Sequence, residues 1–191
     1  MRIIENQEPI FETDKYDVVL VGTSVYDLLV NGFQGKMANK YPYILEANHK
    51  QPYGDLRNLG TRLTLKREGN PIISLLYICG YPKKKFKSLD YDALKQCLTT
   101  AAVEFKDKCI LTTIMGSTSF DGEGSKKRII KMMEKVFEGM DVDVYDYKQM
   151  NGVEERKLKK KQLTEIGVTD NKKRQEILRQ LYLIPADGEK R

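Results

Sequence analysis

The sequence feature that most constrains the fold is an unbroken apolar run at residues 71–79, PIISLLYIC. It is much shorter than the roughly 18 apolar residues of a membrane-spanning helix. It also lacks the polar alternation of a strand with one face in water, so it predicts a central strand that is covered on both faces. Because helices must then pack on both sides of the sheet, the run predicts an α/β protein with a three-layer α/β/α sandwich.

Other segments supply the rest of this sandwich. We expect strands at 17–21, 61–65, 109–114 and 142–147, and helices at 35–40 with the residues before it, 90–105 and 126–137. Glu68, Gly69 and Asn70 separate two strands and indicate a hairpin turn, so the central sheet is expected to be mixed. Residues 142–147, VDVYDY, alternate polar and apolar side chains and predict an edge strand.

The composition changes after residue 150, and we expect a body at 1–150 and a C-terminal helical extension at 151–191. Residues 148–191 hold 12 basic and 7 acidic residues, against 21 and 20 in 1–147. The tail is predicted to form two short amphipathic helices. Two interpretations of it stay open: its apolar stripe docks on the body or on another subunit, or its lysines follow a nucleic-acid backbone. No interleaved aromatic residues are present to stack bases, so docking is the expected role and nucleic-acid binding is not.

Histidine and cysteine content limits the chemistry. His49 is the one histidine, in a polar stretch expected to be a surface loop, and Cys79, Cys97 and Cys109 form no CxxC pair. We therefore expect reduced thiols, no metal site and no cofactor. The N-terminus lacks the charged-then-apolar order of a secretory signal, which predicts a soluble, cytoplasmic protein without a membrane segment. The sequence does not indicate the oligomeric state.

Two segments rich in small polar residues follow predicted strands and are candidate ligand loops. One is Gly22-Thr23-Ser24 followed by Asn31-Gly32-Phe33-Gln34-Gly35, and the other runs from Gly116 to Ser125. Glycine lets the backbone approach a phosphate, and N–H groups at a helix start can share one anion. Each segment alone is typical of an ordinary strand-to-helix connection. Together, at the carboxyl ends of strands in one sheet, they predict a phosphate-binding site.

The order of these elements resembles the macrodomain family, whose members bind ADP-ribose. The resemblance covers about residues 1–147 and is to the branch of ADP-ribose-1″-phosphate phosphatases and terminal ADP-ribose glycohydrolases. NGFQGKMANKYP is similar to that branch's glycine-rich loop and helix, and LGTRLTLKREGNPIISLLYICGY to its hairpin. ILTTIMGSTSFDGEGSKKRIIKMMEKVF resembles its last catalytic strand, phosphate loop and helix, and MDVDVYDY its closing strand.

The resemblance implies an ADP-ribose site and a set of residue roles. Phe33 and Phe120 would sandwich the ribose, Gln7 would contact the adenine, and Asp121 would act as general base in hydrolysis of an ADP-ribosyl or 1″-phosphoryl linkage. A solvated Asp121 that caps the following helix, and packing roles for the phenylalanines, are the structural alternatives. The ligand-binding residues would be Gly22, Thr23, Ser24, Asn31, Gly32, Phe33, Gln34, Gly35, Gly116, Ser117, Thr118, Ser119, Phe120 and Gly122.

Three departures from the family pattern weigh on catalysis. Macrodomains commonly hold the adenine with the aspartate of a Gly-Asp pair; the corresponding place in this chain is near ENQEPI, where Gln7 or Glu8 would have to take that role. The asparagine-bearing loop of the family is replaced by VGTSVYDLLVNG. The resemblance places the nucleophilic lysine of the hydrolases at the end of the central strand. This chain has Cys79 and Gly80 there, and its lysines come slightly later, at residues 83–85. A non-catalytic protein that sequesters an ADP-ribose-derived signal or reads an ADP-ribosylated macromolecule is therefore the alternative.

Overall fold

A computed structural model describes residues 1–5, 7–26, 29, 32–80, 89–117 and 124–146 of the 191-residue chain. Within these residues, α-helices and strands follow one another as β1 (Arg2–Glu5), β2 (Val18–Ser24), α1 (Gly32–Lys40), α2 (Tyr43–His49), β3 (Arg62–Leu65), β4 (Ile72–Cys79), α3 (Tyr91–Glu104), β5 (Ile110–Thr113), α4 (Lys126–Val136) and β6 (Val142–Asp146). Short 3-10 helices form at η1 (Pro9–Phe11), η2 (Thr13–Lys15) and η3 (Leu56–Asn58). The predicted tail at 151–191 lies outside the described residues.

The strands form one mixed sheet in the order β1-β6-β5-β2-β4-β3. Only β3 among the described strands runs antiparallel to its neighbour, β4. Gly69 has a φ of 73° in the turn between β3 and β4, a conformation that glycine adopts without steric cost. The predicted hairpin and the mixed sheet are therefore confirmed.

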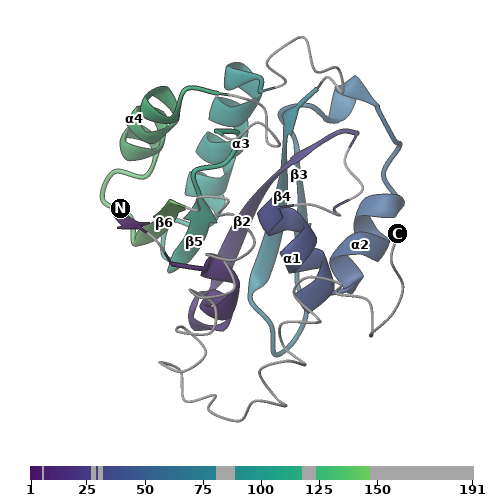
Figure 1. The fold of residues 1–191 in the computed structure, drawn as a ribbon, viewed down its shortest axis with the longest axis horizontal. Helices are drawn as coiled ribbons and strands as arrows, with labels where there is room; N and C mark the ends of the chain where they lie inside the picture. The colour runs from purple at the N-terminus through teal and green to yellow at the C-terminus, as the bar shows by residue number, and fades with distance from the viewer. Residues whose placement is uncertain (6, 27–28, 30–31, 81–88, 118–123, 147–191) are drawn as a thin grey trace, which may run out of the picture.

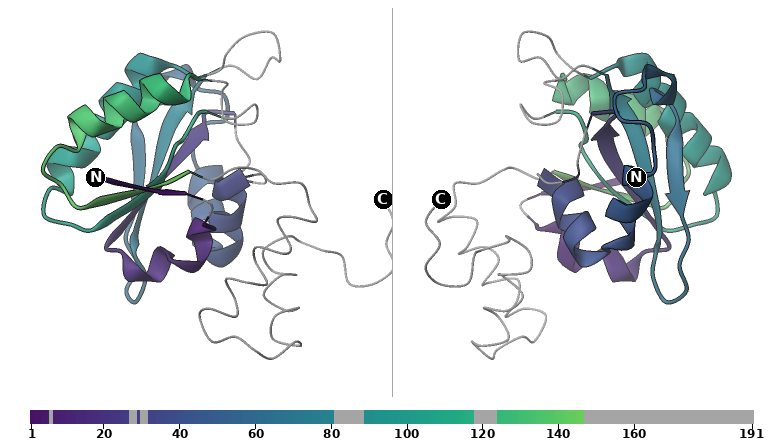
Figure 2. Two further views of the ribbon diagram at one scale, coloured as in Figure 1. Left: turned by 60° about the vertical axis from the view of Figure 1, so that its left-hand side comes forward. Right: turned by 90° about the vertical axis from the view of Figure 1, so that its right-hand side faces the viewer.

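Helices cover both faces of the sheet and confirm the three-layer sandwich (Figures 1 and 2). The side chains of β2 alternate between the two layers: Val18 and Leu20 belong to the core under α3 and α4, while Val19 and Val21 belong to the core under α1 and α2. Strand β4 is buried along nearly its whole length, as its apolar sequence predicts. Among the described residues no helix is both long and apolar enough to cross a membrane.

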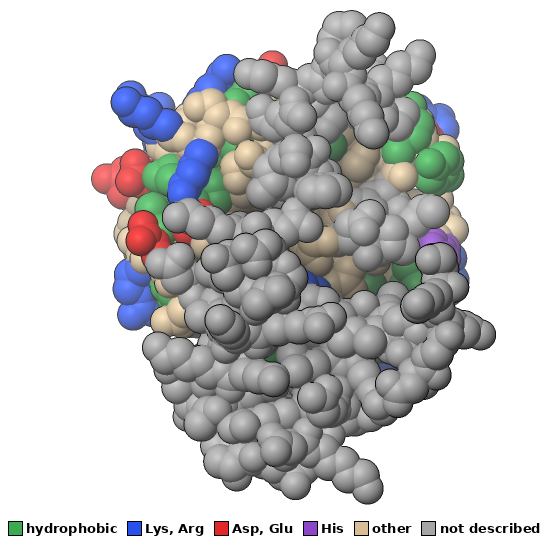
Figure 3. All heavy atoms as spheres, in the orientation of Figure 1, with side chains coloured by type: hydrophobic (Ala, Val, Ile, Leu, Met, Phe, Trp, Pro, Cys, Tyr) green, Lys and Arg blue, Asp and Glu red, His purple; other side chains and the backbone are tan. Residues whose placement is uncertain are grey.

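The prediction that VDVYDY is an edge strand was wrong. Strand β6 lies between β1 and β5, and all five of its residues are buried. Strand β1, which the sequence did not predict, occupies the edge instead. Its Arg2 donates two hydrogen bonds to Asp143, at 2.7 and 2.9 Å, which explains how an acidic residue of β6 is buried. Most of the described charged side chains visible in Figure 3 lie on the side of the molecule that carries β1, β6 and α4, and a few basic ones lie on the opposite side.

Two further boundaries differ from the predictions. Strand β2 continues through Gly22, Thr23 and Ser24, which were expected in a loop, because these residues pair with β4 up to the register Ser24 with Cys79. Residues 43–49 form α2, so His49 ends a helix instead of lying in a loop, although its side chain is exposed as expected.

Candidate functional site

The candidate site lies at the edge of the sheet where the parallel strands β1, β2, β4, β5 and β6 have their carboxyl ends. Loops at this edge are the expected place for a ligand in an open α/β sheet. Gly22, close to the end of β2, has no room for a side chain: an added Cβ would lie 2.7 Å from Met115 Cβ and 2.9 Å from Ile78 Cδ1. Glycine at this position therefore lets β2 approach the residues that follow β5.

Thr23 and Ser24 bring two hydroxyl groups to this end of β2. Thr23 is 3% exposed, and its Oγ1 makes no hydrogen bond within the described part of the chain. A buried hydroxyl without a partner is costly, which makes Thr23 a candidate ligand contact. Ser24 Oγ instead accepts a hydrogen bond from the Tyr26 backbone N–H at 3.1 Å. Ser24 therefore shapes the turn after β2.

Helix α1 begins beside this strand end at Gly32, whose φ is 59°. Asn31, the preceding predicted ligand residue, lies outside the described residues. Phe33 is 7% exposed and packs in the core with Val19 and Val21, which favours a packing role over the predicted stacking on a ribose. Gln34 and Gly35 are also buried in this first turn.

The predicted phosphate loop after β5 is held closed at its base. Gly116, with a φ of 75°, accepts a hydrogen bond at its carbonyl from the Gly124 N–H at 2.8 Å. Ser117 Oγ donates to the Ile114 carbonyl at 2.7 Å, and Ser125 Oγ caps α4 by accepting from the Arg128 N–H. The predicted site residues between these ends, Thr118, Ser119, Phe120, Asp121 and Gly122, lie outside the described residues.

An ion pair that the sequence reading missed fixes the chain at the expected adenine end. Gln7, the predicted adenine contact, is exposed, whereas Glu8 is buried and accepts a hydrogen bond from Lys36 Nζ of α1 at 2.8 Å. The two side chains are only 2% and 8% exposed. The signal in the sequence was Lys36 itself, a charged residue between Phe33 and Met37 on a helix face that must be buried.

The end of β4 carries no lysine, the nucleophile that the resemblance to the macrodomain hydrolases would place there. The strand ends at Cys79, and Gly80 follows it in a buried position, where an added Cβ would meet the Leu59 side chain at 3.2 Å. The lysines at residues 83–85 lie outside the described residues.

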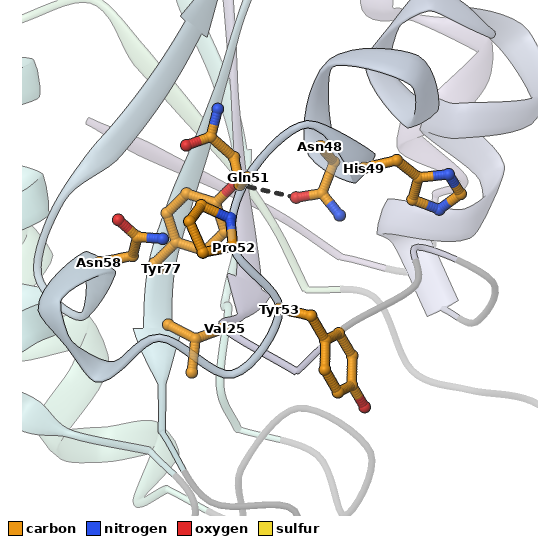
Figure 4. Close-up of a pocket in the computed structure, with 8 residues that line it drawn as sticks. All are labelled: Val25, Asn48, His49, Gln51, Pro52, Tyr53, Asn58 and Tyr77. Atoms are coloured by element: carbon orange, nitrogen blue, oxygen red, sulfur yellow. Dashed lines mark hydrogen bonds between the residues drawn. The ribbon is translucent and has the colours of Figure 1, made fainter.

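A pocket of about 360 Å³ opens beside the ends of β2 and β4 (Figure 4). Tyr77 of β4 donates its hydroxyl to Asn48 Oδ1 at 2.9 Å, and burial raises the pKa of Tyr77 to about 12, so the phenol stays protonated. Tyr53 stands edge-on to Tyr26, with ring centroids 5.7 Å apart. Sequence reasoning missed the pocket because its residues come from β4, α2, the residue after β2 and the segment 51–58, which no local pattern connects.

Comparison with known proteins identifies the fold. No protein-family model and no curated protein matches the sequence. Among solved structures, the macrodomain of Mycobacterium tuberculosis DarG shares 13% identity over 77% of this chain and 99% of its own, with a TM-score of 0.60. The Thermosipho africanus DarTG structure in complex with ADP-ribose shares 13% identity over 80% of this chain and 44% of its own, with a TM-score of 0.60. A protein of unknown function from Bacteroides thetaiotaomicron shares 16% identity over 77% of this chain and 99% of its own, with a TM-score of 0.61. These likenesses show that the chain has the macrodomain fold.

Proposed function

We propose that the chain binds ADP-ribose, or a nucleotide derived from it, at the carboxyl edge of its parallel strands. The observation that carries this proposal is the convergence of two glycine turns, at Gly32 and Gly116, both with positive φ, beside the neighbouring strands β2 and β5. Glycines in this conformation turn successive backbone N–H groups toward one side, an arrangement that favours anions. A solved structure of the same fold, DarTG, holds ADP-ribose, which supports the choice of ligand.

In this proposal each part of the ligand has a partner in the chain. The diphosphate would be held by N–H groups at the start of α1 and in the loop that begins at Gly116. The terminal ribose would lie near Thr23, whose buried hydroxyl makes no hydrogen bond within the described residues. The adenine would lie toward Gln7, where the Glu8–Lys36 ion pair anchors the backbone.

The enzymatic form of the proposal uses Asp121 as general base. Its carboxylate would accept a proton from water while the water oxygen attacks the anomeric carbon, and the bond to the attached group would break. The reaction would remove an ADP-ribosyl group from its carrier or a phosphoryl group from the 1″ position. This assignment rests on the resemblance of the loop that carries Asp121.

One observation favours a second candidate, a binder without catalysis. The end of β4 presents Cys79 and Gly80 in place of a nucleophilic lysine. A chain of this kind would sequester an ADP-ribose-derived signal or recognise an ADP-ribosylated macromolecule, and it would release the ligand unchanged.

Calorimetric titration with ADP-ribose tests binding, with ribose 5-phosphate as the control ligand. We expect saturable heat for ADP-ribose, and no heat at millimolar ligand would refute the proposal. Incubation with an ADP-ribosylated protein or ADP-ribose-1″-phosphate then separates the two candidates. An enzyme should release product and lose turnover in Asp121→Ala while keeping ADP-ribose affinity, whereas a binder should return the substrate intact.

We also propose that residues 1–150 form the ligand-binding body and that 151–191 dock on it or on a second subunit through their leucine and isoleucine side chains. A gel-shift series with DNA and RNA at two salt concentrations tests the alternative. Tight binding that weakens steeply with salt, and that is lost on removing 151–191, would show a nucleic-acid arm and contradict docking. A cytoplasmic location stays a prediction.

A further inference from the structure

Helix α4 begins with an unusual distribution of charge. Its first three residues are Lys126, Lys127 and Arg128, and its first turn contains no acidic side chain. The N-terminal end of a helix carries a partial positive charge, so basic side chains there are unfavourable unless an anion offsets them. The start of α4 follows the loop that begins at Gly116, which is part of the proposed diphosphate site. The basic residues therefore lie where a bound anion would stabilise the helix.

Two of these basic residues have partners in the fold. The Arg128 guanidinium lies 3.8 Å from the centre of the Tyr91 ring. Lys126 Nζ donates a hydrogen bond to Asp146 Oδ2, and the side chains of this pair are 46% and 10% exposed. Asp146 is the last residue of β6, and alternation along the strand turns its side chain to the same face as Val144, the face that carries α4. The buried carboxylate thus holds the lysine at the carboxyl end of β6.

The position of Asp146 places the Lys126 ammonium at the ligand edge. The Ile114 N–H donates to the carbonyl of the residue before Asp146 at 3.1 Å, and Gly116 follows two residues after Ile114. At the far end of the loop, the Gly124 N–H donates to the Gly116 carbonyl at 2.8 Å, two residues before Lys126. Both members of the ion pair are therefore tied to the base of the loop that begins at Gly116.

The lysine has hydrogen-bonding capacity to spare. An ammonium group has three N–H donors. Within the described part of the chain, Lys126 Nζ uses one of them, on Asp146. Its side chain is about half exposed, so the other donors face solvent at this edge. A phosphate oxygen beside the base of the loop can accept one of them while Asp146 keeps its own bond.

We propose that Lys126 is a charged phosphate contact of the ligand site and that Asp146 is its counter-ion while the site is empty. This inference rests on the proposed function, which assigns the diphosphate to backbone N–H groups. Those groups offer partial charges, whereas Lys126 adds a full positive charge to the same edge. On ligand binding, the ammonium is shared between the phosphate and the Asp146 carboxylate, so Asp146 competes with the ligand for the lysine.

Calorimetric titration of the full chain with ADP-ribose tests this role through paired variants. Lys126→Met should weaken binding by about tenfold, through the loss of one half-exposed charged contact. Because Lys126→Met leaves the Asp146 carboxylate buried without its cation, the double variant Lys126→Met with Asp146→Asn is measured beside it and should show the same loss. Asp146→Asn alone should bind at least as tightly as the wild type, since its carboxamide oxygen still accepts from Lys126 but carries no negative charge to compete with the phosphate.

Lys127→Met is the matched control. Lys127 is the next residue of α4 and is exposed, so its replacement removes the same charge from the same turn and should leave the affinity nearly unchanged. A higher salt concentration should reduce the difference between the wild type and the double variant, because salt screens exposed charges. Far-UV circular dichroism checks that each variant is folded, and the double variant decides the question if Lys126→Met is not.

Three results would overturn the role of Lys126. The double variant binds like the wild type, Lys127→Met weakens binding as much as the double variant does, or Asp146→Asn alone loses as much affinity as the double variant. The last result would mean that the ion pair only supports the end of β6. These results require a wild type that binds ADP-ribose, so they leave the proposed function standing. A wild type that gives no heat with ADP-ribose contradicts the proposed function itself, and this inference with it.

Discussion

The buried ion pair between Glu8 and Lys36 offers a sharp test of how the fold holds the segment before β2 against α1, beside the proposed ligand site. Lys36 Nζ and Glu8 Oε2 are 2.8 Å apart, and the side chains are 8% and 2% exposed. Two unit charges at this distance attract by about 6 kcal/mol at an effective dielectric of about 20. The cost of removing both groups from water offsets much of this attraction, so the pair is worth little as a unit.

Breaking the pair has a larger effect, because the buried charge that remains loses the opposite charge 2.8 Å away. We expect Lys36→Met to lower the free energy of unfolding by about 3–5 kcal/mol, and Glu8→Leu to have an effect of similar size. The double variant, which removes both charges and keeps comparable volume, should come back to within about 2 kcal/mol of the wild type. Urea unfolding followed by far-UV circular dichroism measures these values, since the chain has no tryptophan to report by fluorescence.

Two results would refute this reasoning. A loss below about 1 kcal/mol in Lys36→Met would mean that water reaches the carboxylate and that the pair is in effect a surface pair. A double variant as unstable as the sum of the two single variants would mean that the side chains act through packing and not through their charges.

Three further predictions concern the rest of the described structure. Gly22→Ala should destabilise the chain by about 1–3 kcal/mol, because the new methyl group overlaps packed side chains, and thermal denaturation would detect it. Burial raises the pKa of Asp14, but the hydrogen bonds from Lys40 and Tyr41 outweigh burial and lower this pKa below 3.8. The stability that the Asp14 carboxylate adds is therefore present at neutral pH and is lost as the pH falls below about 3.8. Asp14→Asn should lack this contribution to stability at every pH. Burial raises the pKa of Cys97 to about 12, so this thiol should resist a thiol reagent at pH 8 until urea unfolds the chain, and modification of the native chain at Cys97 would contradict its burial.

The layers of this fold could be predicted from the sequence because apolar periodicity records burial directly. The unbroken run at 71–79 became β4, and the glycine between two strand patterns became the hairpin turn at Gly69. Which strand lies at the edge of the sheet could not be predicted in the same way. Asp143 gives β6 the polar alternation of an edge strand, and its burial depends on Arg2, a residue 141 positions away in the chain.

The candidate site also combines features that the local sequence predicts with features that depend on residues far apart in the chain. Gly32 and Gly116 were recognisable because glycine at a strand-to-helix connection signals a special backbone conformation, and both have positive φ. Glu8 was passed over in favour of Gln7 because nothing local reveals that Lys36 would reach back to pair with it. The pocket at Tyr77 was invisible for a related reason, since only the packing of α2 and the segment after it against β4 brings its walls together.

A crystal structure of the chain grown with ADP-ribose tests the central claim most directly. We predict that the diphosphate lies between the start of α1 at Gly32 and the loop that begins at Gly116, and that the terminal ribose lies within hydrogen-bond distance of Thr23. The same structure would give the distance from Asp121 to the anomeric carbon. ADP-ribose bound elsewhere on the chain, or crystals without bound ligand at a saturating concentration, would contradict the account.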